Sequence, residues 1–212
     1  AYSGSVALRA QDFEADVPLE VTVFDFDLPD RMTCTTAFGF SPDRAFQYHN
    51  VSSDADKRTV YEMYLECLSA HHLSPYRPAA LDPLDVSWHD PLPGKEGQTS
   101  FSPEDLTPTF DWTAWDAAMA RAIDHYHFNS FRLGIPGMGG GTFHARHEPS
   151  LLGFAEDTPQ YQAAFTNYCQ AVEAHLREKG WLDEAYVYWF DEPAPKDYAF
   201  VMNGFEKLKR AA

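Results

Sequence analysis

The sequence predicts an α/β protein: the N-terminal half of a (β/α)8 TIM-type barrel, preceded by the end of a β-sandwich domain. Two observations support this fold class. Over residues 31–212, short apolar runs alternate with helical stripes, as in βα units built on a parallel sheet. Over residues 1–30, apolar and polar residues alternate as in antiparallel strands. We therefore expect the last strands and linker of a β-domain at 1–30 and a barrel region at 31–212.

The β-region contains two stretches with strand alternation, residues 5–10 and 17–26. In the second stretch, Leu19, Val21 and Val23 fall on one face. We expect the two stretches to form an antiparallel pair. Pro29 ends this pattern, and the helical stripes begin after it.

Four βα units are expected in the barrel region. Their strands are predicted at residues 34–40, 84–88, 130–136 and 185–190. The helix after the first strand should begin at Asp54 or Asp56 and end before Pro75. A loop rich in Pro, Gly and Ser, residues 90–108, then leads to a helix with apolar residues at three-and-four spacing between 115 and 126.

The last two helices carry the clearest boundary signals. Thr158 is a good N-cap, Pro159 suits the first helical position, and Gly180 suits the C-terminal stop. The helix after the fourth strand begins near Pro195 and ends in basic residues, as the helix dipole favours.

The number of units indicates half of a barrel. Four βα units occupy about 180 residues, and an eightfold barrel of the same rhythm needs about twice that length. A four-stranded parallel sheet would leave two long apolar edges open, which proteins normally avoid. We therefore expect the C-terminal half of the barrel as the partner of these strands.

Composition excludes some function classes. The 16 Lys and Arg residues face 32 Asp and Glu residues, and the formal charge of −16 repels phosphate backbones, so nucleic acid is not expected as a partner. No apolar run reaches the length of a membrane span. Three widely spaced cysteines do not form a disulfide or zinc pattern. Aromatic residues make up 15% of the chain, and flat rings commonly line sugar-binding clefts.

Asp191 and Glu192 are the strongest candidates for catalysis, because they end the fourth predicted strand. In parallel barrels, the catalytic groups lie at the C-terminal ends of the strands. Two acids before a helix also make a good helix entry. Their position and the density of aromatic residues before them lead us to favour the catalytic role.

Adjacent acids do not suit ordinary glycoside hydrolysis, in which two separate carboxylates lie about 5 to 9.5 Å apart across the bond. They suit substrate-assisted hydrolysis, in which the 2-acetamido oxygen of the sugar attacks the anomeric carbon. One acid then protonates the leaving oxygen and the other orients the acetamido group. Where the strand ends in a loop, Glu192 can turn toward the glycosidic oxygen while Asp191 stays directed at the barrel mouth.

Three segments resemble glycoside hydrolase family 123, the β-N-acetylgalactosaminidases, and its DUF4091 relatives. They are "YVYWFDEPAPKDY", "LEVTVFDFDLPDRMTCTTAFGFS" and "DKRTVYEMYLECLSAHHLSP". The resemblance covers nearly the whole chain and the N-terminal half of the family's barrel. It implies a retaining exo-glycosidase without a metal or organic cofactor, acting on a glycan with a terminal 2-acetamido sugar. Glu192 matches the family's acid/base and Asp191 its acetamido-orienting carboxylate.

Four further residues are candidates for substrate binding, because each falls at or after the end of a predicted strand: Trp88, His89, Arg132 and His144. Packing or solvation explains each of them as well, and we favour that role for all but His89. The segment "PGMGGGTFHARHE" lacks the Lys-Ser/Thr of a phosphate loop and the spacing of a helical zinc motif. A metal-dependent barrel hydrolase and a non-catalytic carbohydrate-binding protein stay open as alternatives.

Overall fold

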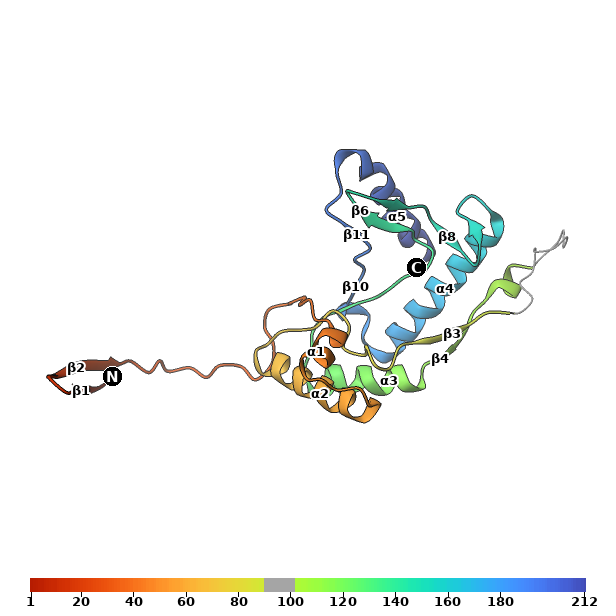
Figure 1. Ribbon diagram of the computed structural model, residues 1–212. Coiled ribbons are helices and arrows are strands. Elements are labelled where there is room, and N and C mark those ends of the chain that lie inside the picture. The colour runs from red at the N-terminus through yellow and green to blue at the C-terminus, as the bar shows by residue number, and fades with distance from the viewer. Residues whose placement is uncertain (90–101) are drawn as a thin grey trace. The chain divides into compact units, whose positions relative to one another are not determined.

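The computed structural model describes residues 1–89 and 102–212, which form two compact units, Ala1–Arg31 and Met32–Ala212 (Figure 1). The boundary lies one residue from the one that the sequence predicts. Most of the loop expected at residues 90–108 lies outside the described residues. Within the described ranges, no helix has both the length and the apolar character needed to cross a bilayer.

The first unit is a β-hairpin of β1 (Tyr2–Ala10) and β2 (Phe13–Val21), paired antiparallel from Ala10↔Phe13 to Tyr2↔Val21. The predicted antiparallel pair is confirmed, although β2 begins earlier than expected and ends before Val23. Paired residues point to the same side of the hairpin, so the apolar side chains gather on one face and remain exposed. These are Tyr2, Val6, Leu8, Phe13, Val17, Leu19 and Val21. The assignment of this hairpin to a β-sandwich stays a proposal.

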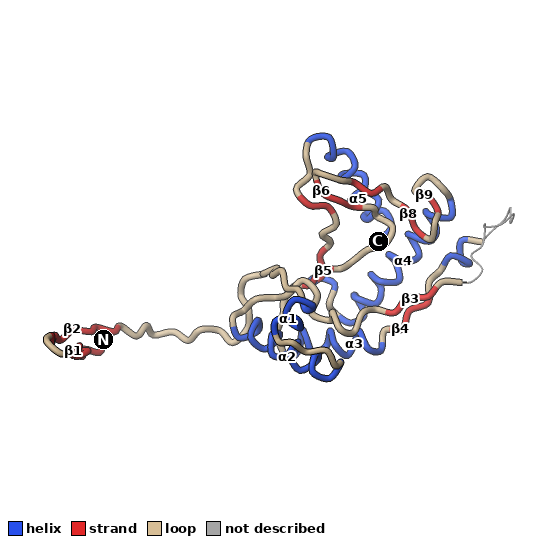
Figure 2. Tube along the Cα trace, in the orientation of Figure 1, coloured by secondary structure: helices blue, strands red, loops and turns tan. Residues whose placement is uncertain are grey.

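The second unit combines helices with very short strands (Figure 2). The helices are α1 (Pro42–Tyr48), α2 (Asp54–Ala70), α3 (Thr113–Ala120), α4 (Pro159–Lys179) and α5 (Tyr198–Ala211), with shorter turns η1 (Pro103–Leu106), η2 (Arg121–His125), η3 (Leu182–Glu184) and η4 (Pro195–Asp197). The strands are β3 (Asp85–Ser87), β4 (Thr109–Asp111), β5 (Phe131–Arg132), β6 (Gly140–Thr142), β7 (Arg146–His147), β8 (Ser150–Leu151), β9 (Phe154–Ala155), β10 (Ala185–Tyr186) and β11 (Phe190–Asp191).

Four extended segments of this unit lie side by side in the order of the sequence. Phe38 and Pro75 form a parallel bridge, and the Arg132 amide donates a 2.8 Å hydrogen bond to the Tyr76 carbonyl. β5 and β10 pair in parallel, with Phe131 opposite Ala185. Helices α2, α3 and α4 connect the successive segments, which is the order of consecutive βα units. The described residues form no closed barrel, and the half-barrel stays a proposal.

The second segment of this array is not the one that the sequence predicts. The apolar pattern places residues 84–88 there, but β3 pairs antiparallel with β4, with Val86 opposite Phe110. The second segment is instead the short stretch around Pro75, directly after α2. Proline favours extended backbone for itself and for the residue before it, yet this stretch is too short to show an apolar pattern. The prediction of a second parallel strand at 84–88 is therefore wrong.

One face of the array packs against helices. The ring of Phe131 meets the edge of Trp115 at 6.3 Å between centroids, and Phe40 stacks on Tyr64 at 5.0 Å. Successive side chains of a strand alternate between faces, so Arg132 belongs to the opposite face. We call this opposite face the inner face and define it by Tyr76, Arg132 and Tyr186.

Helix boundaries largely follow the predicted signals. The Thr158 hydroxyl accepts a hydrogen bond from the Tyr161 amide at the start of α4, and Gly180 ends that helix with φ of 74°. Both predictions are confirmed. The N-cap of α2 is Ser53, whose hydroxyl accepts from the Asp56 amide, so the expected caps at Asp54 and Asp56 lie inside the first turn.

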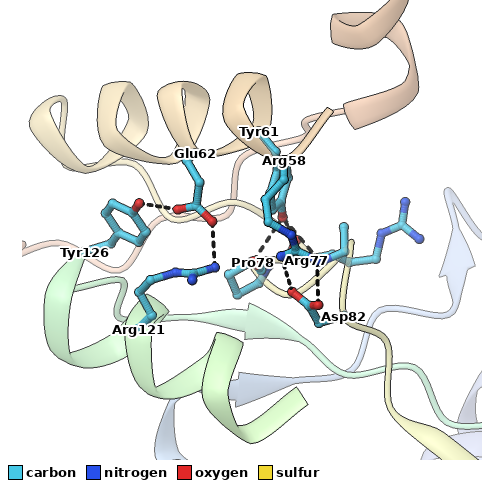
Figure 3. A network of polar contacts seen from close by, with 9 residues as sticks. Arg58, Tyr61, Glu62, Arg77, Pro78, Asp82, Arg121 and Tyr126 are labelled. Carbon is cyan, nitrogen blue, oxygen red and sulfur yellow. Dashed lines mark hydrogen bonds and ion pairs between the residues drawn. The ribbon is translucent and has the colours of Figure 1, made fainter. Parts of the chain in front are cut away.

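A network of polar contacts ties α2 to its neighbours (Figure 3). Arg58 donates two hydrogen bonds of 2.9 Å to Asp82, and these bonds lower the pKa of that carboxyl. On the next turn, Glu62 lies 2.6 Å from Arg121 and accepts a 2.5 Å hydrogen bond from the Tyr126 hydroxyl. The network thus connects α2 to two parts of the chain. One is Asp82, which follows the segment around Pro75, and the other is the helical region of Arg121 and Tyr126, which precedes β5.

Candidate active site

Asp191 ends β11, which pairs in parallel with β6. In this pairing Asp191 lies opposite Thr142. The glycines of β6 permit the close approach of the two strands: a Cβ at Gly140, where φ is 145°, would lie 2.9 Å from the Trp189 carbonyl oxygen. The glycine-rich segment therefore serves strand pairing beside the acids.

Glu192 has a left-handed backbone, with φ of 46°. The other non-glycine residues with positive φ are Asn50, His72 and His127, each just after a helical segment, and Leu152 in the turn between β8 and β9. Glu192 instead follows a strand directly and precedes Pro193, a position at which extended backbone is strongly preferred. Such strain clusters at functional sites.

This backbone changes how the two consecutive acids are directed. In a continuous strand, Asp191 and Glu192 would point to opposite faces. The left-handed turn at Glu192 ends the pleat at that residue, so the alternation no longer applies. Both residues are exposed.

Tyr188 holds the first acid. Its hydroxyl donates a hydrogen bond to Oδ1 of Asp191. This hydrogen bond raises the pKa of the Tyr188 phenol, and the charges of Asp191 and Glu192 raise it further. Tyr188 therefore stays protonated, and remains a donor to Asp191, over the neutral pH range.

The inner face contains Tyr186, two residues before Tyr188 in the chain. The guanidinium of Arg132 lies over the Tyr76 ring, 5.5 Å from its centroid. Tyr186 lies opposite Arg132 in the pairing of β5 and β10. Burial raises the pKa of the Tyr186 phenol, the Tyr76 phenol raises it further, and Arg132 lowers it. Tyr76 also contributes to the raised pKa of Tyr188, so it lies within electrostatic reach of both tyrosines.

His144 is the second predicted binding residue that the structure brings to this region. It lies in the turn between β6 and β7, and its amide donates a 3.2 Å hydrogen bond to the Thr142 hydroxyl. Thr142 is the residue opposite Asp191. The His144 ring is exposed and contacts the Phe143 ring, with centroids 3.8 Å apart.

Trp88 and His89 are not brought to the acids. Both follow β3, and the hairpin of β3 and β4 lies apart from β11 in Figure 1. Trp88 is half-buried and packs against the core cluster that includes α4. His89 is exposed.

Sequence reasoning missed three tyrosines of the site: Tyr76, Tyr186 and Tyr188. A signal for two of them was present, because the alternation of "AYVYWF" places Tyr186 and Tyr188 on one face. Tyr76 had no such signal, since it follows Pro75 outside any apolar pattern.

A cavity of about 290 Å³ lies at the ends of the second and third segments. Its lining includes Arg132 but neither acid, and most of the other lining residues are apolar. The acids themselves are open to solvent. In the described part of the chain, no group of three or more His, Cys, Asp or Glu side chains is placed to hold a metal ion.

Comparison with known protein families and with curated proteins found no match to this chain. The chemistry of the site therefore rests on its own residues: an acid held by a tyrosine, a second acid on a strained turn, and an arginine with tyrosines on the inner face. Such a pair of acids can catalyse a reaction in which the substrate supplies its own nucleophile. One acid donates and then accepts a proton, and the other is a fixed carboxylate.

Proposed function

We propose that this chain carries the catalytic acids of a retaining, substrate-assisted exo-glycosidase of the family 123 type. It removes terminal β-linked N-acetylgalactosamine, or another 2-acetamido sugar, from glycans. In this proposal, residues 31–212 are the first four βα units of a (β/α)8 barrel, and the acids lie at the C-terminal end of its fourth strand. The order of the parallel segments supports consecutive βα units. The structure divides the predicted strand 185–190 into β10, the fourth segment, and β11, so the acids follow the fourth segment at the end of β11, which pairs with β6.

One observation carries the proposal: Glu192 adopts left-handed backbone directly after Asp191, which is itself held by Tyr188. A simple helix entry does not need a strained glutamate before a proline. Two consecutive acids that both contact one sugar do need such a turn, because in a regular strand their side chains would point to opposite faces.

The reaction follows from these roles. Glu192 donates its proton to the glycosidic oxygen while the substrate's acetamido oxygen forms a bond to the anomeric carbon, and the bond between that carbon and the glycosidic oxygen breaks, so that the rest of the glycan leaves as an alcohol. Asp191 accepts a hydrogen bond from the acetamido N–H and stabilises the positive charge that develops there. Glu192 then takes a proton from water, which opens the cyclic intermediate and releases the sugar with retained configuration.

The test uses aryl β-glycosides of N-acetylgalactosamine, N-acetylglucosamine and galactose. We expect turnover of acetamido sugars, inhibition by a thiazoline that mimics the cyclic intermediate, and no turnover of the galactoside. Glu192→Gln and Asp191→Asn should each lower kcat by roughly 10²- to 10⁴-fold. A dinitrophenyl leaving group, which needs no proton, should restore much of the rate in Glu192→Gln and little in Asp191→Asn.

Two exposed acids serve as matched controls: Glu206→Gln and Asp183→Asn should leave the rates unchanged. Equal cleavage of the galactoside would refute the assisted mechanism. Glycan binding without turnover, unaffected by Glu192→Gln, would indicate a carbohydrate-binding protein instead. Loss of activity on chelation, with Asp191→Asn still active, would indicate a metal-dependent hydrolase.

A further inference from the structure

Arg132 is a half-buried cation without a counter-ion. None of the ion pairs among the described residues includes it. Glu184, two residues before Tyr186, has a buried carboxylate oxygen without a hydrogen-bond partner, yet it does not pair with Arg132. The guanidinium is held over the Tyr76 ring instead. Its charged hydrogen-bond donors therefore remain available on the inner face.

Tyr186, the register partner of Arg132 in the adjacent strand, supplies a second hydrogen-bond donor. Its hydroxyl is buried and has no hydrogen-bond partner. A buried polar atom without a partner costs free energy, commonly about 1 to 3 kcal/mol, unless a ligand satisfies it. Since Tyr186 lies opposite Arg132, one bound group can accept hydrogen bonds from both.

We propose that Arg132 and Tyr186 form a subsite for an anionic substituent, a sulfate ester or a carboxylate, on the ring of the terminal sugar. This inference rests on the proposed function and names a substrate class for it: acidic 2-acetamido sugars. A neutral hydroxyl would satisfy Tyr186 but would leave the charge of Arg132 unbalanced. An anionic oxygen satisfies both, through the charge-assisted hydrogen bonds that guanidinium groups form with planar or tetrahedral anions.

The proposal also assigns the side of the sugar that carries the anion. Asp191 follows Tyr186 by five residues, so at most about 18 Å of extended chain separates the acids from the subsite. The anomeric carbon has to lie at Glu192. In this proposal, the anion is carried on the opposite side of the ring, at C4 or C6, and the subsite binds it there. The same arginine offsets the repulsion that the two acids and the net charge of −16 exert on an anionic substrate.

The test compares four nitrophenyl β-glycosides: the parent N-acetylgalactosaminide, its 4-sulfate, its 6-sulfate, and the analogue with a carboxylate at C6. We expect kcat/KM for at least one anionic substrate to exceed that of the parent by roughly 10- to 100-fold, with the preference reduced by added salt. The best of the three distinguishes a sulfate from a carboxylate subsite. Arg132→Gln should bring the ratio of anionic to parent kcat/KM close to one, and Arg132→Lys should restore part of it.

Arg44→Gln is the matched control, because Arg44 is an exposed arginine of α1 that does not line the cavity that includes Arg132. It should keep the wild-type ratio. Turnover of the parent without preference for any anionic form would overturn the inference and leave the proposed function standing. An equal loss on all four substrates in Arg132→Gln, with a lower melting temperature, would show a structural role and also overturn it.

A binding measurement tests the anionic subsite independently of the proposed catalytic function. If no glycoside is hydrolysed, the proposed function fails, and calorimetric titration with free N-acetylgalactosamine and its 4- and 6-sulfates decides the inference alone. Tighter binding of a sulfated sugar that is lost in Arg132→Gln would support the subsite. Equal binding of the three sugars would overturn it.

Discussion

The Tyr188 hydroxyl donates a hydrogen bond to Oδ1 of Asp191, three residues further along the same segment. One oxygen of the carboxylate is thereby engaged, and the other is left for a ligand. Because this bond raises the pKa of Tyr188, the donor is retained at the pH values at which a glycosidase works. In the proposed mechanism, Tyr188 positions Asp191 and does not contact the substrate's reacting atoms.

Removing this hydroxyl tests its role. Tyr188→Phe should lower kcat for acetamido sugars by roughly 10- to 100-fold, since hydrogen bonds to charged groups contribute about 1.5 to 3 kcal/mol. In an Asp191→Asn background the same change should have little effect, because the two residues act as one unit. Tyr198→Phe, at an exposed tyrosine in α5, serves as the control. Additive losses in the double variant would show that Tyr188 acts independently of Asp191.

The strained backbone of Glu192 predicts that glycine is more stabilising than alanine at this position, the reverse of the usual order. Glu192→Gly should be more stable than Glu192→Ala by about 1 kcal/mol, because only glycine adopts positive φ without cost. At the neighbouring extended position, Asp191→Gly should be less stable than Asp191→Ala by about 0.5 to 1 kcal/mol. Urea unfolding of the four variants measures this. The same order at both positions would contradict the left-handed conformation.

Gly204 of α5 provides space for Trp189, which precedes β11. A Cβ at Gly204 would overlap the indole ring, and Phe200 and Phe205 restrict the ring on other sides, at centroid distances of 5.2 and 6.1 Å. Gly204→Ala should therefore destabilise the protein by about 1 to 3 kcal/mol. Activity should fall as well, because Trp189 lies two residues before Asp191.

Gly134→Ala is the control for this substitution, because a Cβ added at Gly134 would meet nothing within 4 Å. It should change stability by less than about 1 kcal/mol. Thermal unfolding and tryptophan fluorescence report both variants. An unchanged melting temperature in Gly204→Ala would mean that α5 and Trp189 do not pack as described.

Buried acidic groups predict a loss of stability at alkaline pH. Burial raises the pKa of the Cys169 thiol to about 12, and it raises the pKa of Tyr61 and Tyr168 to about 12 as well. In the unfolded chain these groups ionise from about pH 9 to 10. Between pH 9 and 12 the unfolded state then binds fewer protons than the native state, so the free energy of unfolding falls as the pH rises.

Cys169→Ala should reduce this decline, measured by urea unfolding at pH 8 and pH 10.5, whereas the tyrosines keep part of it. At pH 8 the native protein should expose two reactive thiols, Cys34 and Cys67, and the third only after unfolding. Rapid labelling of all three thiols in the native protein would contradict the burial of Cys169.

Local signals in the sequence were sufficient where neighbouring residues decide the conformation. The cap at Thr158, the proline after it and the glycine stop define α4 because each acts on backbone groups within one turn. The apolar stripe of that helix is buried as its spacing predicts. The same kind of signal placed Asp191 and Glu192 at the end of an extended segment.

The sequence by itself thus determined helices α2 to α5, the hairpin of the first unit and the position of the two acids in the chain, whereas α1 was not predicted. Only the tertiary structure decided that the stretch around Pro75 replaces residues 84–88 in the parallel array, and that Tyr76 and Arg132 meet beside Tyr186. The physical reason is the range of the interactions. Caps and helical stripes act over a few residues. Strand partners and the contact of Arg132 with Tyr76 depend on contacts between residues that are from 24 (Val86 and Phe110) to 56 (Tyr76 and Arg132) positions apart in the chain.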